Sequence, residues 1–209
     1  MDLKKDLEKA LVELKKEKQR KFDQTVDLII NLQKFDIRKS SISLFITLPN
    51  KVKDKKIAAF LETKNDNVDT IISSEFKKYS DKKELKNLVK KYDFFIAQAS
   101  LMPKVATYFG RVLGPAGKMP SPHLGILTNI NDREINNLKS KINNILKIRV
   151  KEASIKIPVG KQSMPEKDIL ENITSIYEEV LKNLPQQKDN VKNIELKFTM
   201  TKPIKIKVR

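Results

Sequence analysis

The sequence predicts two domains: a split α+β domain formed by both chain termini, and a small parallel α/β domain inserted into it. Two observations lead to this prediction. The flanking parts of the chain alternate apolar and polar residues, as half-buried antiparallel strands do. The middle instead alternates short, wholly apolar runs with helical stretches, which is typical of parallel strands covered on both faces. We therefore place the domains at residues 1–55 with 148–209 and at residues 56–147.

The first predicted element is an amphipathic helix over residues 2–20, where four leucines recur at helical spacing among lysines. The next two runs, VDLIINL (26–32) and ISLFITL (42–48), are rich in β-branched residues and are predicted strands. The separator between them, QKFDIRKSS, is long for a tight hairpin.

In the middle of the chain, three apolar runs are predicted to be strands buried on both faces: residues 56–61, 69–73 and 93–99. Only about eight residues link the first two runs, whereas a parallel crossover usually needs a dozen or more. Either the crossover helix is lost or reduced, or the strand pair is irregular. Asp81 and Glu84 have the spacing of a capping box before a helix. Further helices are predicted over residues 101–110 and from about Asn131.

The alternation of apolar and polar residues returns near the C-terminus. IRVKEASIKIPVG (148–160) and NIELKFTMTKPIKIKV (193–208) are predicted to be strands, the second continuing to its end. Between them, Ser163 and Glu166 have the spacing of a capping box for an amphipathic helix that reaches Leu184.

The composition of the chain limits the kinds of partner and reaction that it can have. A formal net charge of +17 over 209 residues favours a polyanionic partner. No apolar run is long enough to span a membrane, and the N-terminus lacks the apolar core of a signal peptide, so we expect a cytoplasmic protein. Cysteine is absent and His123, expected in a loop, is the only histidine. This leaves little material for metal sites or nucleophilic triads, and we expect no enzyme activity, metal or cofactor.

Four of the five glycines fall within residues 110–125, among three prolines, which predicts a stiff loop. The spacing of a phosphate-binding loop is absent, since Gly117 and Lys118 are followed by Met119 rather than Ser or Thr. Two interpretations remain open: an ordinary structural turn, or a rigid loop that presents amides, Lys118 and Arg111 to a large anion. We favour the second.

A second candidate contact is Phe22, which follows two cations where the first helix gives way to the first strand. An aromatic ring beside cations can stack on an unpaired base, and the alternative is that Phe22 is a core residue. Lysine greatly outnumbers arginine, which favours recognition of backbone and shape over base readout.

The run VLGPAGKMPSP (112–122) closely resembles the signature of the ribosomal protein L-one family, a large-subunit protein of the mobile stalk. Three further segments match that family in order and spacing: FDQTVD (22–27), PVG (158–160) and Thr199-Met200. The resemblance covers essentially the whole chain and is closer to archaeal and eukaryotic members. It departs at Ala116, where a basic residue is usual, at Thr201-Lys202, where Gly-Pro is usual, and in the short stretch after Leu61. These are the marks of a divergent or reduced member.

The resemblance implies a split RNA-binding α+β sandwich with an inserted Rossmann-like domain. It implies a structural constituent of the large ribosomal subunit that binds the stalk region of its rRNA near the tRNA exit site. The family's stalk accompanies release of deacylated exit-site tRNA, and some members repress translation of their own mRNA. We expect a monomer when free of the ribosome, with no membrane partner. The alternatives are a nucleotide-dependent enzyme that uses the inserted domain and a general basic DNA-binding protein.

The resemblance also assigns residues. The RNA-binding residues are Arg20, Lys21, Phe22, Asp23, Thr25, Gly160, Lys161, Thr199, Met200, Thr201 and Lys202. The inserted-domain loop consists of Arg111, Gly114, Pro115, Gly117, Lys118, Met119 and Pro120. This assignment requires Phe22 and Met200 to lie on one surface of the folded chain.

Overall fold

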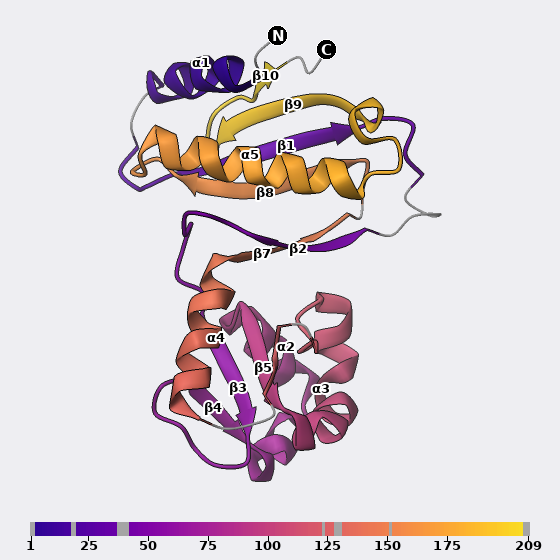
Figure 1. Ribbon diagram of the computed structural model, residues 1–209. Helices are drawn as coiled ribbons and strands as arrows, with labels where there is room; N and C mark the ends of the chain where they lie inside the picture. The colour runs from indigo at the N-terminus through magenta and orange to yellow at the C-terminus, as the bar shows by residue number, and fades with distance from the viewer. Residues whose placement is uncertain are drawn as a thin grey trace. The chain divides into compact units, whose positions relative to one another are not determined.

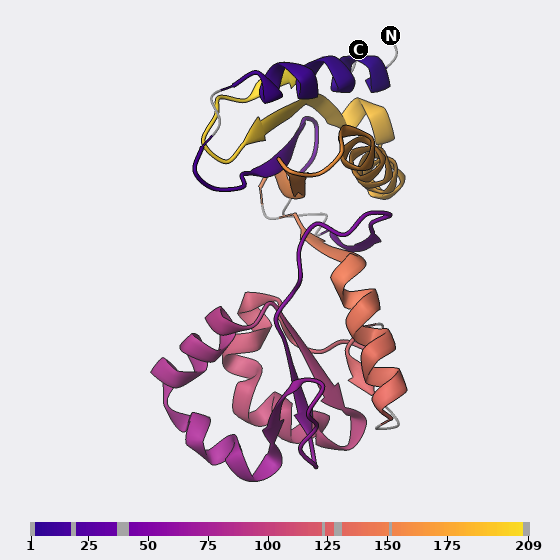
Figure 2. The same cartoon turned by 90° about the vertical axis from the view of Figure 1, so that its left-hand side faces the viewer.

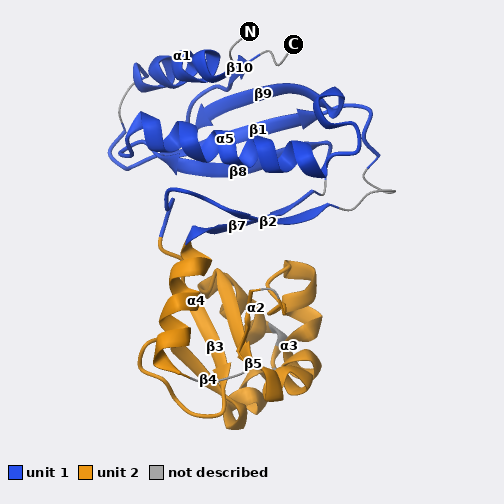
Figure 3. Ribbon diagram, in the orientation of Figure 1, with its two compact units in different colours: residues 1–53, 144–209 blue, residues 54–143 orange. Residues whose placement is uncertain are grey.

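Figure 1 shows the computed structural model of the chain, which describes residues 3–17, 20–36, 42–122, 124–127, 131–150 and 152–206. His123 lies outside the described residues, as do the last residues of the strand predicted over 193–208. The chain forms two compact units (Figure 3). Residues 1–53 and 144–209 make up unit 1, and residues 54–143 make up unit 2.

Unit 1 contains a four-stranded antiparallel sheet in the order β10-β9-β1-β8. Its strands are β1 (Thr25–Leu32), β8 (Ser154–Lys161), β9 (Val191–Phe198) and β10 (Ile204–Ile206). Because successive side chains point to opposite faces, Val26, Leu28 and Ile30 of β1 are fully buried while Asp27 and Ile29 are half-buried. One face of the sheet therefore belongs to the core, and the other carries polar side chains.

Two helices cover the core face of this sheet, α1 (Leu3–Lys15) and α5 (Glu166–Asn183), and they also contact each other (Figure 2). The leucine stripe of α1 is buried at Leu7, Leu11 and Leu14, as its spacing predicts. The helix ends at Lys15, five residues before the predicted end. A short 3-10 helix, η3 (Gln187–Asn190), precedes β9.

The chain leaves and re-enters unit 1 through a two-stranded antiparallel ribbon, β2 (Ser43–Thr47) with β7 (Ile145–Arg149). The amide of Leu48 donates to the carbonyl of Asn144 at 2.7 Å and continues the ribbon by one step. Apolar residues of the ribbon join the core that α1, α5 and the large sheet form. Asn172 of α5, whose side chain is fully buried, donates to the carbonyl of Asn50 and ties the exit segment to the helix.

Unit 2 contains a parallel sheet in the order β4-β3-β5-β6. Its strands are β3 (Ile57–Leu61), β4 (Asp69–Ile72), β5 (Phe94–Gln98) and β6 (Ile126–Leu127). All residues of β3 are buried, as predicted. The strand predicted over residues 69–73 is confirmed as β4, but its predicted burial on both faces is wrong, because β4 is an edge strand in which Asp69 is exposed and only Ile71 is buried. The sequence analysis missed β6, which has only two residues.

No helix connects β3 to β4: residues 62–68 cross between these parallel strands as a loop. The hydroxyl of Thr70 accepts from the Asn65 amide at 3.1 Å. The side-chain amides of Asn65 and Asn67 both donate to Oδ1 of Asp132, at 2.7 and 3.2 Å. The crossover helix is therefore lost, and side-chain hydrogen bonds hold the short loop in its place.

Helices cover both faces of the parallel sheet. One face carries η1 (Ser73–Ser80), α2 (Lys82–Lys91), η2 (Ala99–Leu101) and α3 (Met102–Ala116), and the other carries α4 (Asp132–Asn144). Asp81 caps α2 by accepting from the Lys83 amide at 3.1 Å, so the predicted helix start is correct. Four fully buried phenylalanines fill the first face: Phe60, Phe76, Phe95 and Phe109.

Two predictions near the C-terminus are wrong. The residue before α5 is Pro165, which makes no side-chain cap, and Ser163 instead binds Asp23 in another segment. The run 193–208 is not one strand: β9 and β10 pair antiparallel with each other across a turn that begins at Thr199.

The predicted fold class is confirmed, since unit 1 is an α+β structure with an antiparallel sheet and unit 2 is a parallel α/β structure. None of the described helices is long and apolar enough to cross a membrane.

Candidate nucleic-acid interface

The start of β1 and the ends of β8 and β9 meet at one end of the sheet in unit 1. Thr25 lies opposite Lys161 in the register with β8, and Val26 lies opposite Phe198 in the register with β9. The Thr25 amide donates to Oγ1 of Thr199 at 3.2 Å, and the Thr199 amide donates to the Thr25 carbonyl at 3.1 Å. We call residues 20–25, 161–163 and 199–202 the strand-end surface. Phe22 and Met200 belong to its adjoining segments, as the residue assignment requires.

Gln24 joins the three segments of the strand-end surface. Its carbonyl accepts from the Gln162 amide at 2.8 Å, and its Oε1 accepts from the Met200 amide at 3.3 Å. Its side chain is only 1% exposed. Sequence analysis did not select Gln24, although it is in phase with the buried positions Val26 and Leu28, a signal that could have identified it.

The large apolar side chains of Phe22 and Met200 are 51% and 61% exposed. The interpretation of Phe22 as a core residue is therefore wrong. In the described part of the chain only two other large apolar side chains are exposed, Val12 and Tyr108. Exposed apolar groups on adjoining turns are typical of a surface that contacts a partner, and here they stand beside cations.

Four cations belong to the strand-end surface. Arg20, Lys21 and Lys202 are exposed, and Lys161 is half-exposed with its Nζ 3.9 Å from the carboxylate of Asp23. Such cations can neutralise phosphates that run past the two apolar side chains.

Asp23 is the one acidic residue of the strand-end surface. Its carboxylate accepts from the Ser163 amide at 3.1 Å and from the Ser163 hydroxyl at 2.8 Å. Asp23 therefore holds the turn after β8 against the start of β1. We assign it a positioning role, and its predicted RNA contact stays a prediction.

Gly160 and Thr201 also have structural roles. Gly160 is buried, and a Cβ there would lie 2.9 Å from Cγ1 of Ile169, so α5 and not RNA explains the glycine. The predicted contact from Gly160 is thus corrected. Oγ1 of Thr201 accepts from the Phe198 amide at 2.9 Å and closes the turn after β9. Thr201 does not have a positive φ. The turn therefore forms without the glycine that the family resemblance leads one to expect at this position.

The prediction of a stiff glycine-rich loop is wrong for its first half. Helix α3 continues to Ala116, so Gly110 and Gly114 are helical and Pro115 lies in the last turn. The helix stops at Gly117, which has φ of 70°. The Gly117 amide donates to the Gly114 carbonyl and the Lys118 amide to the Leu113 carbonyl, the pattern of a glycine-terminated helix.

Lys118 does not present its charge to an anion. Its Nζ donates to the carbonyls of Val89 and Tyr92, both at 2.7 Å, where α2 ends. Met119 packs against the core and Pro120 is buried. Of the loop's side chains, Arg111 is the exposed cation, and it lies on α3. The arrangement agrees with the structural turn and corrects the anion-binding interpretation of Lys118.

Beside the strand-end surface, the polar face of the sheet carries Asp27. Burial raises the pKa of this carboxyl above its ordinary value, and the opposite charge of Lys197, its partner on β9, offsets part of the rise. Within the described residues, no group of three or more histidine, cysteine or acidic side chains is placed to hold a metal ion.

Comparison with known proteins adds to this geometry. The sequence profile of the Ribosomal protein L1p/L10e family matches residues 14–202. Proteins named large ribosomal subunit protein uL1 are similar over nearly the full length. That of Nanoarchaeum equitans is 34% identical, covering 90% of this chain and 93% of its own. That of Pyrobaculum arsenaticum is 35% identical and covers 93% of this chain and 89% of its own. That of Pyrococcus abyssi is 30% identical and covers 91% of this chain and 90% of its own.

The matched region includes all three segments of the strand-end surface and the whole of unit 2. A match of this extent shows membership directly, and the chain belongs to the ribosomal protein L1p/L10e family.

Proposed function

We propose that this protein is a structural constituent of the large ribosomal subunit and binds the stalk region of large-subunit rRNA through the strand-end surface. Its relatives carry the name of a large-subunit protein. The observation that carries the proposal is the exposure of Phe22 and Met200 on hydrogen-bonded neighbouring segments, beside four cations.

The proposed binding mode divides the work between apolar and charged groups. An aromatic ring and a thioether offer flat contact to an unpaired base or a ribose, whereas lysine and arginine bind phosphates. Gln24 and Asp23 fix the turns that carry these groups before RNA arrives. Less binding energy is then spent on ordering the surface.

We extend this proposal to the finer roles that the resemblance implies. The protein would accompany release of deacylated tRNA from the exit site, and a similar fold in its own mRNA would compete for the same surface and repress translation. It would act in the cytoplasm, on the ribosome, and be monomeric when free.

Replacing Phe22 or Met200 with alanine tests the surface. Each variant should weaken binding to a stalk-RNA fragment by about 1–3 kcal/mol, the usual contribution of one stacked base. The free energy of unfolding should change little, because both side chains are exposed. The matched control is Val12→Ala, which removes an exposed apolar side chain from α1 and should leave the affinity unchanged. Unchanged affinity in both test variants would refute the assignment.

The alternative functions give different results. A general basic DNA-binding protein would bind duplex DNA and stalk RNA with similar affinity, whereas recognition of RNA shape and ribose hydroxyls predicts a clear preference for RNA. A nucleotide-dependent enzyme would release or absorb heat when titrated with ATP or NAD.

A further inference from the structure

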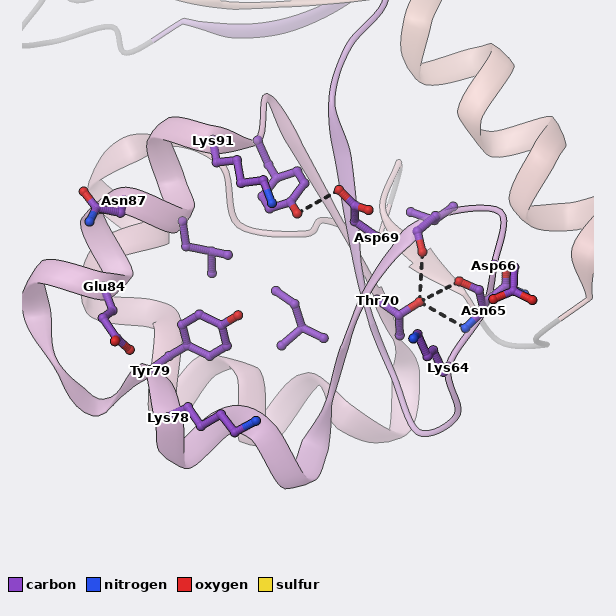
Figure 4. A pocket seen from close by; sticks show the side chains of 14 residues that line it. Lys64, Asn65, Asp66, Asp69, Thr70, Lys78, Tyr79, Glu84, Asn87 and Lys91 are labelled. Atoms are coloured by element: carbon purple, nitrogen blue, oxygen red, sulfur yellow. Dashed lines mark hydrogen bonds between the residues drawn. The ribbon is translucent and has the colours of Figure 1, made fainter.

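Unit 2 contains a cavity of about 690 Å³ that the RNA-binding proposal does not use. Figure 4 shows Tyr79, Asn87 and Lys91 on one side of it and Lys64, Asp69 and Thr70 on the other. A volume of this size lies within the usual range for ligand sites in proteins.

One wall of the cavity is the open edge of the parallel sheet. Three consecutive residues of β4 line it: Asp69, Thr70 and Ile71. Since neighbouring side chains of a strand point to opposite faces, a cavity that touches all three must border the edge of the strand. Within the described residues β4 pairs only with β3, so no strand occupies its other edge.

The opposite wall is a single stripe of helix α2. It consists of Glu84, Asn87, Leu88 and Lys91, at positions i, i+3, i+4 and i+7. Seven helical steps span about 10 Å. The four residues of β4 span about the same length. The cavity is therefore a groove with the sheet edge and the loop before β4 on one side and a face of α2 on the other, long enough for three or four extended residues.

The floor of the groove is apolar, and contacts within unit 2 hold its wall. Ile71 and Leu88 are buried, and the half-buried Tyr79 ring packs at 5.8 Å from the ring of Phe109. The hydroxyl of Tyr92 donates to Asp69 at 2.8 Å and fixes one end of β4. An apolar side chain of a ligand would find a fixed contact at the centre.

The charges of the rim distinguish between ligand classes. Three lysines, Lys64, Lys78 and Lys91, are balanced by three acids, Asp66, Asp69 and Glu84. The groove is thus formally neutral in a chain of net charge +17. A neutral rim gives a polyphosphate no advantage, whereas an extended peptide with an apolar side chain suits a sheet edge above an apolar floor.

We propose that this groove binds an extended segment of a partner protein, which adds to β4 as a fifth strand of the sheet. Backbone hydrogen bonds to the outward groups of β4 supply the affinity. An apolar side chain of the segment enters between Ile71, Leu88 and Tyr79 and supplies the selectivity. The proposal is independent of RNA binding, because its residues all lie in unit 2 and outside the strand-end surface.

The test uses the full chain and a capped heptapeptide, acetyl-Lys-Thr-Ile-Thr-Val-Thr-Glu-amide. Binding should shift the amide resonances of residues 69–72 and slow hydrogen exchange at the outward amides of β4, with a dissociation constant of about 1 mM or tighter. Peptides N-methylated at alternate residues keep every side chain but cannot pair in one of the two registers. One of these two peptides should bind at least about tenfold more weakly, a loss of 1.4 kcal/mol.

Two surface variants complete the test. Asn87→Trp fills the groove from its exposed wall and should reduce peptide binding at least about tenfold. Lys86→Trp, one residue earlier on α2 and outside the stripe, is the matched control and should bind normally. Both variants should retain affinity for stalk RNA. The proposal is overturned if no shift occurs at saturating peptide, if both N-methylated peptides bind fully, or if an octauridylate shifts these amides in place of the peptide.

Discussion

The buried amide of Gln24 fixes two exposed turns at the residue scale. Its Oε1 accepts from the Met200 amide and its Nε2 donates to Oε1 of Gln162, partners that lie in the turns just after the strands flanking β1. A buried polar group is tolerated only when it is hydrogen-bonded, and Gln24 meets this condition by bonding to the segments that carry the predicted RNA contacts. The positions of the exposed residues Phe22 and Met200 thus depend on a buried residue.

Asp27 gives a pH-dependent prediction. Its pKa in the folded protein is raised by burial, so the folded state prefers the protonated form. The carboxylate therefore costs stability at neutral pH, and this cost disappears as the pH falls below the pKa of the unfolded state. Asp27→Asn should raise the melting temperature at pH 7, and the gain should shrink towards zero in acid. Thermal unfolding across pH checks it, and a gain that is constant with pH would contradict this account.

The exposed residues were accessible to sequence reasoning because each lies within a short local pattern. Phe22 follows two cations, and Thr199-Met200 interrupts an alternating strand. The bonds from Gln24 join residues 138 and 176 positions apart, and those from Asp23 join residues 140 apart. Such pairs depend on the register of the sheet, which no local pattern contains.

Helix α3 shows at the element scale how glycine and proline can mislead. A cluster of both favours a loop, yet Gly110 and Gly114 lie in the helix and only Gly117 has a positive φ. Pro115 fits because, in the last turn, it forfeits one hydrogen bond and does not interrupt the middle of the helix. The end of a helix depends on single hydrogen bonds of this kind. This explains why the presence of α3 was easier to predict from the sequence than the residue at which it ends.

The glycines of α3 give a prediction with an internal control. Alanine at Gly110 or Gly114 should stabilise the protein by about 0.5–1 kcal/mol, because both are helical and an added Cβ meets no atom within 4 Å. Alanine at Gly117 should instead cost about 1–2 kcal/mol, the price of a left-handed residue with a Cβ. Denaturant unfolding measures all three. Loss of stability at Gly110 and Gly114 would restore the stiff-loop interpretation.

The two units have separate cores at the scale of the whole molecule. The core of unit 1 contains only residues before 54 and after 143, whereas two smaller cores fill unit 2 on either side of its sheet. The sequence indicated these two units because its hydrophobic pattern changes from alternating residues to wholly apolar runs, and parallel and antiparallel sheets bury their strands differently.

Excision of unit 2 tests how RNA affinity is divided. Joining Lys53 to Asn144 through a short Gly-Ser linker should leave a folded unit 1, because the bond from Leu48 to Asn144 already holds the two connections together. This variant should retain most of the affinity for stalk RNA. With six to ten phosphate contacts, affinity should fall roughly 10³–10⁵-fold between 50 and 200 mM salt. A folded variant that no longer binds would refute the proposed division.

The position of β1 at the centre of its sheet has a consequence for synthesis. β1 is made early, but its two partners, β8 and β9, are made more than a hundred residues later. Unit 2 is continuous in sequence and can fold while β1 still waits for neighbours. A released chain truncated after residue 150 should therefore protect the amides of β3 and β5 from exchange but not those of β1. The strand-end surface is therefore complete only after translation has passed residue 202.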